Sequence, residues 1–259
     1  MVAAWKKKDS PPRRVKPVPI RVIRHIAYLA RNCTPSASNS FVVAVADMII
    51  IAFFFLLRPG EYTDSNQEST PFRFCDVQLF IGQRRLDLLH DSIALILEAR
   101  FASLTFTDQK NGVRGEVIGL GCSGDSYLCP VKAIIRRVIY LRLNSAPPDV
   151  PLARLFNQTS RITASVITST LREAVTLLGP ELGFLPSDIS ARCLRASGAM
   201  ALLLGQIDTD IIRLIGRWRS DEMLRYLHLQ AAPLMQDYAR KMLMAGDYSL
   251  IPNQLVPMR

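Results

Sequence analysis

Residues 190–228 combine many cationic side chains with one possible nucleophile. The segment contains six arginines and no lysine, and Tyr226 lies close to its end. Arginine presents a planar fork of donors that matches the oxygens of a phosphate or carboxylate, and it stays charged at any working pH. The composition therefore indicates either a defined anion site or two solvated helix faces. The segment alone does not decide between them.

Two further groups of charged residues stand where the chain is expected to turn. Arg58 and Glu61 follow a long apolar run, and Lys110 precedes an Asn-Gly step that favours a tight hairpin. Each has an ordinary explanation, because an arginine at a helix end compensates the dipole and a lysine at a hairpin tip is usually solvated. Their meaning depends on whether the fold brings them to the arginine-rich segment.

The element before Arg58 is predicted to be a helix in the centre of a globular domain. Residues 41–57 contain one charge, Asp47, and Thr34 followed by Pro35 marks a helix start upstream. A membrane span is the alternative, but the run is at the short limit for crossing a bilayer and has an aspartate in its middle. We therefore expect a buried helix that stops at the RPGE step of residues 58–61.

The rest of the pattern predicts a mostly helical α+β domain with a small antiparallel sheet. Strands are expected at 72–81, 103–107 and 113–120, the last two joined by the hairpin of Lys110, and residues 91–100 fit either a helix or a strand. Apolar periodicity and capping residues predict helices at 19–32, 130–144, 163–178, 189–206, 210–217, 221–229 and 233–245.

Most of the net charge lies at the N-terminus. The chain of 259 residues has a formal charge of +10, and residues 1–24 hold eight basic residues against one aspartate, so +7 lies there. Such an arm suits a nucleic-acid backbone or an anionic membrane equally well. Its candidate DNA-binding residues are Lys6, Lys7, Lys8, Arg13, Arg14 and Lys16.

The number and spacing of cysteines and histidines argue against a fold held by disulfide bonds or a metal ion. Five scattered cysteines without a CxxC pair, and three histidines, predict neither a disulfide framework nor a zinc site. This fits a reducing compartment. The N-terminus has charge without a following apolar core, so it is not a secretion signal.

Taken in order, these pieces resemble the catalytic domain of the tyrosine recombinases, also called the phage-integrase family. LLRPGEY at 56–62 resembles the arginine box of the family, FTDQKNGVRG at 106–115 its lysine hairpin, and RCLR at 192–195 stands where the family usually has His-x-x-Arg. Arg217 follows a glycine and precedes Tyr226 by nine residues, which is the family spacing. Order and spacing together carry the resemblance. The segments SYLCPVKAI and GRWRSDEMLRY look most similar to recombinases of eukaryotic mobile elements, the Crypton and DIRS-like groups.

The resemblance implies cleavage and rejoining of DNA strands through a 3′-phosphotyrosyl intermediate, with no metal or other cofactor. Tyr226 is the expected nucleophile, and the covalent link would conserve the energy of the phosphodiester bond. Arg58 and Arg195 are expected to clamp the non-bridging phosphate oxygens, and Arg217 to add a further donor. Lys110 is expected to protonate the departing 5′ hydroxyl, which an ammonium can do and a guanidinium effectively cannot.

Three more residues receive roles of lesser weight. Glu61 is expected to orient an arginine. Trp218 is expected to be a core or interface anchor. Shifting the alignment with the family motif by one residue would instead give it the role of Arg217. Arg192 replaces a histidine and can stabilise charge but not act as a base near pH 7, so we expect a slow active site or an inactive one.

The same resemblance defines domains, partners and rivals. Residues 1–18 are expected to be a Pro-rich basic linker from an N-terminal DNA-binding domain missing here, 19–250 the catalytic domain and 251–259 a tail. Double-stranded DNA is the expected partner, with a tetramer on DNA, a monomer without it, and no membrane. The nucleus is expected for a eukaryotic element and the cytoplasm otherwise. A type IB topoisomerase, a catalytically dead DNA-binding descendant and a membrane-surface protein are the rivals.

Overall fold

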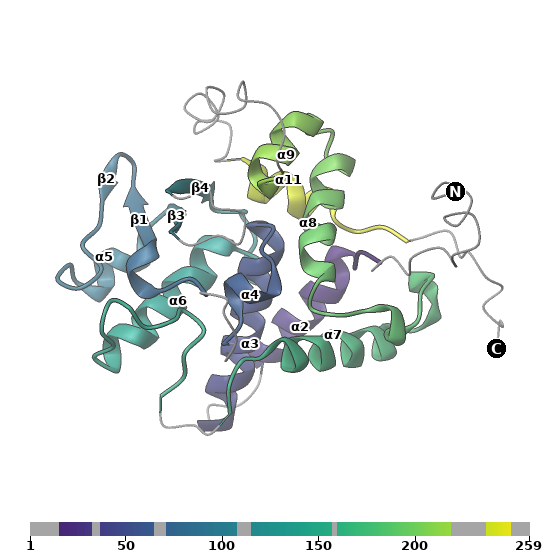
Figure 1. Cartoon of the computed structure of the whole chain (residues 1–259), viewed down its shortest axis with the longest axis horizontal. Coiled ribbons are helices and arrows are strands. Elements are labelled where there is room, and N and C mark those ends of the chain that lie inside the picture. Colours follow the sequence, from purple (N-terminus) through teal and green to yellow (C-terminus); the bar gives the residue numbers. More distant parts are fainter. Residues whose placement is uncertain are drawn as a thin grey trace, which may run out of the picture.

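The computed structural model describes residues 16–32, 37–64, 71–107, 115–156, 160–218 and 237–249. In these ranges, helices surround a long central helix, and a four-stranded antiparallel sheet lies to one side of it (Figure 1). The predicted α+β class with a small antiparallel sheet is therefore confirmed.

Helix α3 (Ala37–Phe54) forms the centre of the fold because its apolar residues meet neighbours on all sides. Every residue from 44 to 57 is at most 3% exposed. Fully burying one such side chain contributes roughly 1.5–3 kcal/mol, so this element supplies a large share of the core. Its neighbours are α2 (Ile20–Asn32), α6 (Pro130–Leu143), α7 (Ala164–Leu178) and α8 (Cys193–Leu204). None of the helices described has the length and apolar character to cross a membrane.

The single charge in this apolar helix, Asp47, is neutralised by arginines from two neighbouring helices. Its carboxylate accepts hydrogen bonds of 2.6–3.0 Å from Arg136 of α6 and one of 3.2 Å from Arg31 of α2. Asp47 is 1% exposed. Because a buried charge is costly unless it is paired, this triad ties α2 and α6 to the central helix.

The sheet has the strand order β2-β1-β3-β4. β3 and β4 form the predicted hairpin and pair from Phe101↔Gly121 to Phe106↔Glu116. The tip of this hairpin, with Lys110, lies outside the described residues. Helix α6 packs against β3 and β4. The strands are β1 (Val77–Ile81), β2 (Arg84–Arg85), β3 (Phe101–Phe106) and β4 (Glu116–Gly121).

Several element boundaries differ from the sequence expectation. The strand predicted at 72–81 starts at Val77, because Asp76 accepts a hydrogen bond of 2.9 Å from the backbone N–H of Arg73 and closes a 3₁₀ turn before it. Residues 91–100 contain a short helix, α5 (Ile93–Leu97), capped by Ser92. The strand β2 was not predicted, since two exposed arginines give no apolar alternation.

The predicted helices at 19–32, 130–144, 163–178 and 210–217 are confirmed within two residues by α2, α6, α7 and α9 (Thr209–Gly216). Helix α8 begins at Cys193 rather than 189, because a 3₁₀ turn at Pro186–Asp188 leads into an irregular step. The helix predicted at 221–229 lies outside the described residues. Of the segment at 233–245, the described part forms α11 (Tyr238–Ala245).

Helix α8 approaches α3 closely because Gly198 has no side chain. A Cβ at this position would lie 2.1 Å from the carbonyl oxygen of Phe53, far inside van der Waals contact. Gly198 lies less than one turn after Arg195. This backbone contact therefore sets the distance between Arg195 and the end of α3.

Candidate functional site

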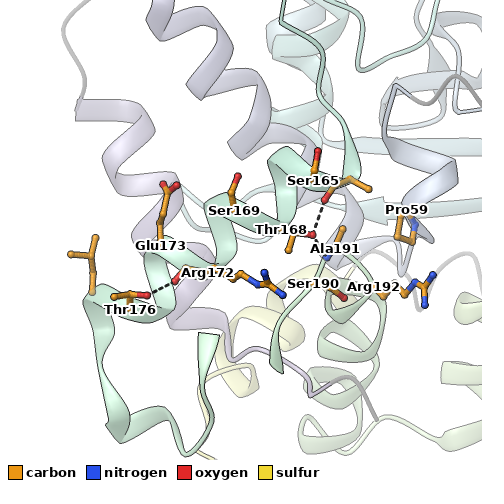
Figure 2. Close-up of a pocket in the computed structure, with 12 residues that line it drawn as sticks. Pro59, Ser165, Thr168, Ser169, Arg172, Glu173, Thr176, Ser190, Ala191 and Arg192 are labelled. Atoms are coloured by element: carbon orange, nitrogen blue, oxygen red, sulfur yellow. Dashed lines mark hydrogen bonds between the residues drawn. The ribbon is translucent and has the colours of Figure 1, made fainter. Parts of the chain in front are cut away.

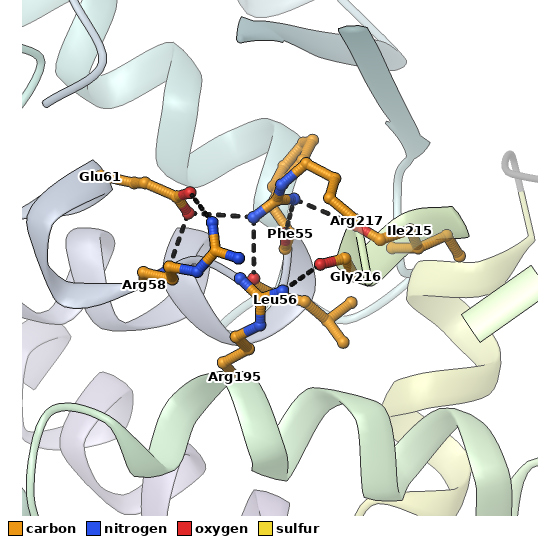
Figure 3. Close-up of polar contacts among 8 residues, drawn as sticks. All are labelled: Phe55, Leu56, Arg58, Glu61, Arg195, Ile215, Gly216 and Arg217. Atoms are coloured by element: carbon orange, nitrogen blue, oxygen red, sulfur yellow. Dashed lines mark hydrogen bonds and ion pairs between the residues drawn. The ribbon is translucent and has the colours of Figure 1, made fainter. Parts of the chain in front are cut away.

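Three arginines that are distant in sequence gather around one carboxylate, Glu61 (Figure 3). Arg58 stands just before α4 (Pro59–Tyr62), Arg195 in the first turn of α8, and Arg217 just after α9. The irregular turn that follows α3 places Arg58 here, and Pro59 starts a new short helix rather than simply ending the previous one. Four predicted site residues are thus neighbours in space.

Glu61 holds two of these arginines in place. Its Oε2 accepts hydrogen bonds from the backbone N–H of Arg58 at 2.7 Å and from Nη2 of Arg217 at 2.9 Å. Its Oε1 accepts from Nη1 of Arg58 at 3.3 Å. This is the geometry expected of a carboxylate that orients an arginine, and the side chain is only 14% exposed.

Arg217 directs its guanidinium into the protein. Its Nη1 donates to the carbonyl oxygens of Phe55 at 3.2 Å and Ile215 at 3.0 Å, and its Nη2 donates to Leu56 at 3.1 Å and to Glu61. The side chain is 2% exposed. A guanidinium has four N–H bonds on its two Nη atoms, so these contacts use all of them. The fifth N–H, on Nε, is buried without a hydrogen-bond partner among the described residues.

Arg195 lies between the cluster and Trp218. Its Nη2 donates to the carbonyl oxygen of Gly216, and its guanidinium carbon lies 4.6 Å from the centroid of the Trp218 ring. Its Nη1 is buried without a hydrogen-bond partner among the described residues. Trp218 is 37% exposed, so it forms part of the wall between this guanidinium and solvent.

The cluster carries more positive than negative charge. Three guanidinium groups lie near two carboxylates, Glu61 and, on the side of Arg217, Glu116. Burial together with the charges of Arg217 and Arg58 lowers the pKa of Arg195 to about 9. Burial likewise lowers the pKa of Arg217 to about 10, against the opposing effect of Glu61. A bound anion would relieve this repulsion and offer oxygens to the unpartnered N–H of Arg195. The arrangement is chemically suited to a phosphate or sulfate group.

Arg192 lies apart from this cluster, on an open groove of about 1100 Å³ beside α7 (Figure 2). It is exposed and makes no hydrogen bond or ion pair with the described residues. Pro59, the neighbour of Arg58, forms the adjoining rim of the groove. On the other side α7 contributes Arg172 and the hydroxyls of Ser165, Thr168, Ser169 and Thr176. An anion held by Arg58 would therefore lie next to a groove whose lining includes Arg172 and Arg192 together with Glu173.

The described tyrosines are poor candidates for a nucleophile. Tyr62 is fully buried, donates to the carbonyl of Ala191, and burial raises its pKa well above the usual range. Burial also raises the pKa of Tyr238 and of Tyr248, the two tyrosines nearest Tyr226 in the sequence. Tyr140 donates to the carbonyl of Phe156. The rings of Tyr28 and Tyr127 contact each other at a tilt of 45°, with centroids 5.8 Å apart. Tyr226 itself lies outside the described residues.

Most of the predicted DNA-binding arm is also outside the described residues: Lys6, Lys7, Lys8, Arg13 and Arg14. Lys16 is described, and its Nζ lies 3.3 Å from the carboxylate of Asp188. Lys110 and Tyr226 therefore stay predictions in both position and role.

Sequence reasoning missed three features of the cluster. The carbonyls of Phe55 and Leu56 accept from Arg217, and Phe106, the last residue of β3, lies under its guanidinium with a centroid distance of 3.9 Å. The sequence cannot reveal backbone acceptors. It does show that Phe106 stands at the start of the Lys110 hairpin, and this position could have indicated a place near the site. Gly216 was noted only for its spacing, but a Cβ there would lie 1.7 Å from the Trp218 ring.

No protein-family model matches the chain, and no curated protein matches it at the significance required.

Proposed function

We propose that the chain cleaves and rejoins DNA strands through a tyrosine linked to the 3′ phosphate, with the catalytic fold of the tyrosine recombinases. The observation that carries the proposal is the convergence of Arg58 and Arg195, which lie 137 positions apart, on a site with excess positive charge and an unpartnered buried donor. Because the chemistry needs charge neutralisation on two phosphoryl oxygens, two fixed guanidinium groups are its central requirement.

The location of the cluster also supports this function. It lies at the base of the β3–β4 hairpin, since Phe106 packs under Arg217, and Lys110 follows Phe106 by four residues. Tyr226 follows Arg217 by nine residues. Both partners that the reaction needs, a proton donor and a nucleophile, are therefore on segments that start at the cluster. Among the described tyrosines, Tyr62 and Tyr238 are buried, burial raises the pKa of Tyr248, and Tyr140 is hydrogen-bonded. The rings of Tyr28 and Tyr127 contact each other.

The structure favours Trp218 over Arg217 as the additional contact to a phosphate. All four Nη hydrogens of Arg217 are used within the protein, whereas Trp218 is partly exposed beside Arg195. The benzo edge of its indole faces Gly216, so the pyrrole edge with the N–H points away from that residue. We therefore assign the additional hydrogen bond to the phosphate to Trp218, as the alignment shifted by one residue would have it.

Selection from a random DNA pool tests the proposal without a known target site. Duplexes carrying a nick beside a randomised segment lose the short fragment after cleavage, so the covalent adduct accumulates. We expect denaturant-resistant adducts to be enriched and to map to Tyr226, and Tyr226→Phe to abolish them. Enrichment of DNA binding with no adduct would identify the dead descendant instead. Adduct on another tyrosine would refute the site.

A modified substrate separates the roles of Lys110 and Arg195. A sulfur in place of the bridging 5′ oxygen leaves as a thiolate and needs no proton from a general acid. We expect Lys110→Ala to recover cleavage on this substrate and Arg195→Ala to stay inactive, since Arg195 acts on the non-bridging oxygens. Recovery of both variants, or of neither, would contradict the assignment. Relaxation of supercoiled plasmid without joining of two sites would favour the topoisomerase rival.

A further inference from the structure

Arg217 contacts two described segments that adjoin predicted catalytic residues, and the residue before it binds a third such segment. It binds the carbonyls of Phe55 and Leu56, which precede Arg58, and the carboxylate of Glu61 (Figure 3). Its guanidinium lies 3.9 Å from the ring of Phe106 at the base of the hairpin of Lys110. The peptide before it, at Gly216, accepts the hydrogen bond of Arg195.

The acceptors around Arg217 explain how a cation is tolerated in the interior. Phe55 and Leu56 directly follow α3, and Ile215 is in the last turn of α9, so the guanidinium meets the negative ends of two helices. Glu61 adds one full negative charge. Burying a charge without such partners would be strongly unfavourable.

The backbone on both sides of this contact is held in a conformation that L residues rarely adopt. Leu56 has φ of 51° and Arg217 has φ of 55°. Such residues persist only when the surrounding structure fixes them. The hydrogen bond from Nη2 of Arg217 to the carbonyl of Leu56 joins these two turns to each other.

We propose that Arg217 is a positioning residue: it connects the turn before Arg58, the base of the lysine hairpin and the turn that binds Arg195, and it does not itself contact the phosphate. The inference rests on the proposed function and changes the role expected for this residue. Loss of the guanidinium would release Glu61, and with it Arg58, and would let the Gly216 carbonyl move away from Arg195.

A titration of the unmodified protein with inorganic phosphate tests the inference directly. The Nε–H signals of arginines can be followed by nuclear magnetic resonance. We expect the Nε–H signals of Arg58 and Arg195 to shift when phosphate binds and that of Arg217 to keep its position. The Nε–H of Arg217 should also exchange slowly with solvent both before and after phosphate is added. A shift of the Arg217 signal equal to that of Arg195 would overturn the proposal, because it would indicate direct contact.

Two lysine variants separate positioning from general stability. Arg137 is a matched control, because it is 2% exposed, donates to the carbonyls of Leu152 and Arg154, and lies over the Tyr140 ring. We expect Arg217→Lys and Arg137→Lys both to lower the melting temperature. Only Arg217→Lys is expected to weaken phosphate binding, by about tenfold or more at a temperature where both variants are folded.

The outcomes distinguish this inference from the proposed function. If the unmodified protein shifts no arginine signal with phosphate, the anion site and the proposed function fail together with the inference. If it binds phosphate but Arg217→Lys binds equally well, or Arg137→Lys weakens binding as much, only the positioning role is wrong. If Arg217→Lys does not fold, the titration of the unmodified protein decides. Covalent DNA adduct formation is not needed for any of these measurements.

Discussion

Replacement of Glu61 by glutamine tests the charge balance of the arginine cluster. The two side chains have nearly the same shape, so the change removes a charge and converts one acceptor oxygen into a donor. Glu61 accepts three hydrogen bonds, two on Oε2 and one on Oε1. In the variant the amide NH₂ would face the N–H of Arg58 or Arg217, whichever way it is turned.

The expected loss of stability is large for a single substitution. Arg217 and Glu61 have side chains that are 2% and 14% exposed, so solvent screens the pair weakly. Removing one partner of a buried ion pair costs about 3–5 kcal/mol, and the remaining amide oxygen places this variant near about 3 kcal/mol. For a chain of this size that corresponds to a fall in the melting temperature of about 6–12 °C.

The assay is thermal and urea-induced unfolding with and without sodium phosphate. Asp210→Asn is the control, because its ion pair with Arg213 is solvent-exposed and its removal should cost at most about 1 kcal/mol. We further expect phosphate to stabilise Glu61→Gln more than the unmodified protein, because Arg58 and Arg217 then lose the negative charge that lies between them. Sodium chloride at equal ionic strength controls for screening.

Two results would refute the reasoning. One is a variant whose stability is within about 0.5 kcal/mol of the unmodified protein, the range of ordinary surface changes. The other is a phosphate effect no greater than that of chloride, which would mean that the excess positive charge does not form an anion site.

Three further predictions follow from other parts of the structure. Asp47→Asn should lower the free energy of unfolding by about 3 kcal/mol or more, because two arginines lose their buried counter-charge; a change below 1 kcal/mol in urea unfolding would contradict the triad. Gly216→Ala should displace the Trp218 ring and raise its fluorescence quenching by solvent iodide, since a Cβ would lie 1.7 Å from the ring; unchanged quenching would refute that contact. The neighbouring Cys122 thiol and backbone N–H groups lower the pKa of Cys129 below its usual range, so the stability that its thiolate adds is lost as pH falls through the lowered pKa and grows up to the ordinary pKa of a thiol. The excess stability over Cys129→Ser should then rise by on the order of 1 kcal/mol per pH unit in this window under reducing conditions, and a flat difference would be evidence against the shift.

The sequence was most informative where side-chain patterns decide local structure. Apolar periodicity, together with the proline at the start of α6, placed α6, α7 and α9 within two residues. The apolar run before Arg58 was correctly assigned to a central helix, because its surroundings are apolar on every side.

The sequence predicted part of the candidate site. The order of Arg58, Glu61, Arg195 and Arg217 indicated a shared site, and these residues do gather. Arg192, predicted with them, lies apart on the groove, and Lys110 and Tyr226 are outside the described residues. Backbone carbonyls at the ends of α3 and α9 decide which guanidinium faces outward. Because every residue has a backbone carbonyl, the sequence does not reveal these acceptors. The spacing to Tyr226 favoured Arg217 as a donor, although its Nη hydrogens are all used inside the protein.

Gly198 gives the site a vulnerability that no functional group reveals. It carries no chemistry, yet any side chain there would press on the carbonyl of Phe53 and push α8 away from α3. Arg195 would move with the helix while Arg58 stayed behind. In a survey of all single substitutions, this glycine should therefore tolerate change as poorly as the arginines that it keeps together, and even alanine should be selected against.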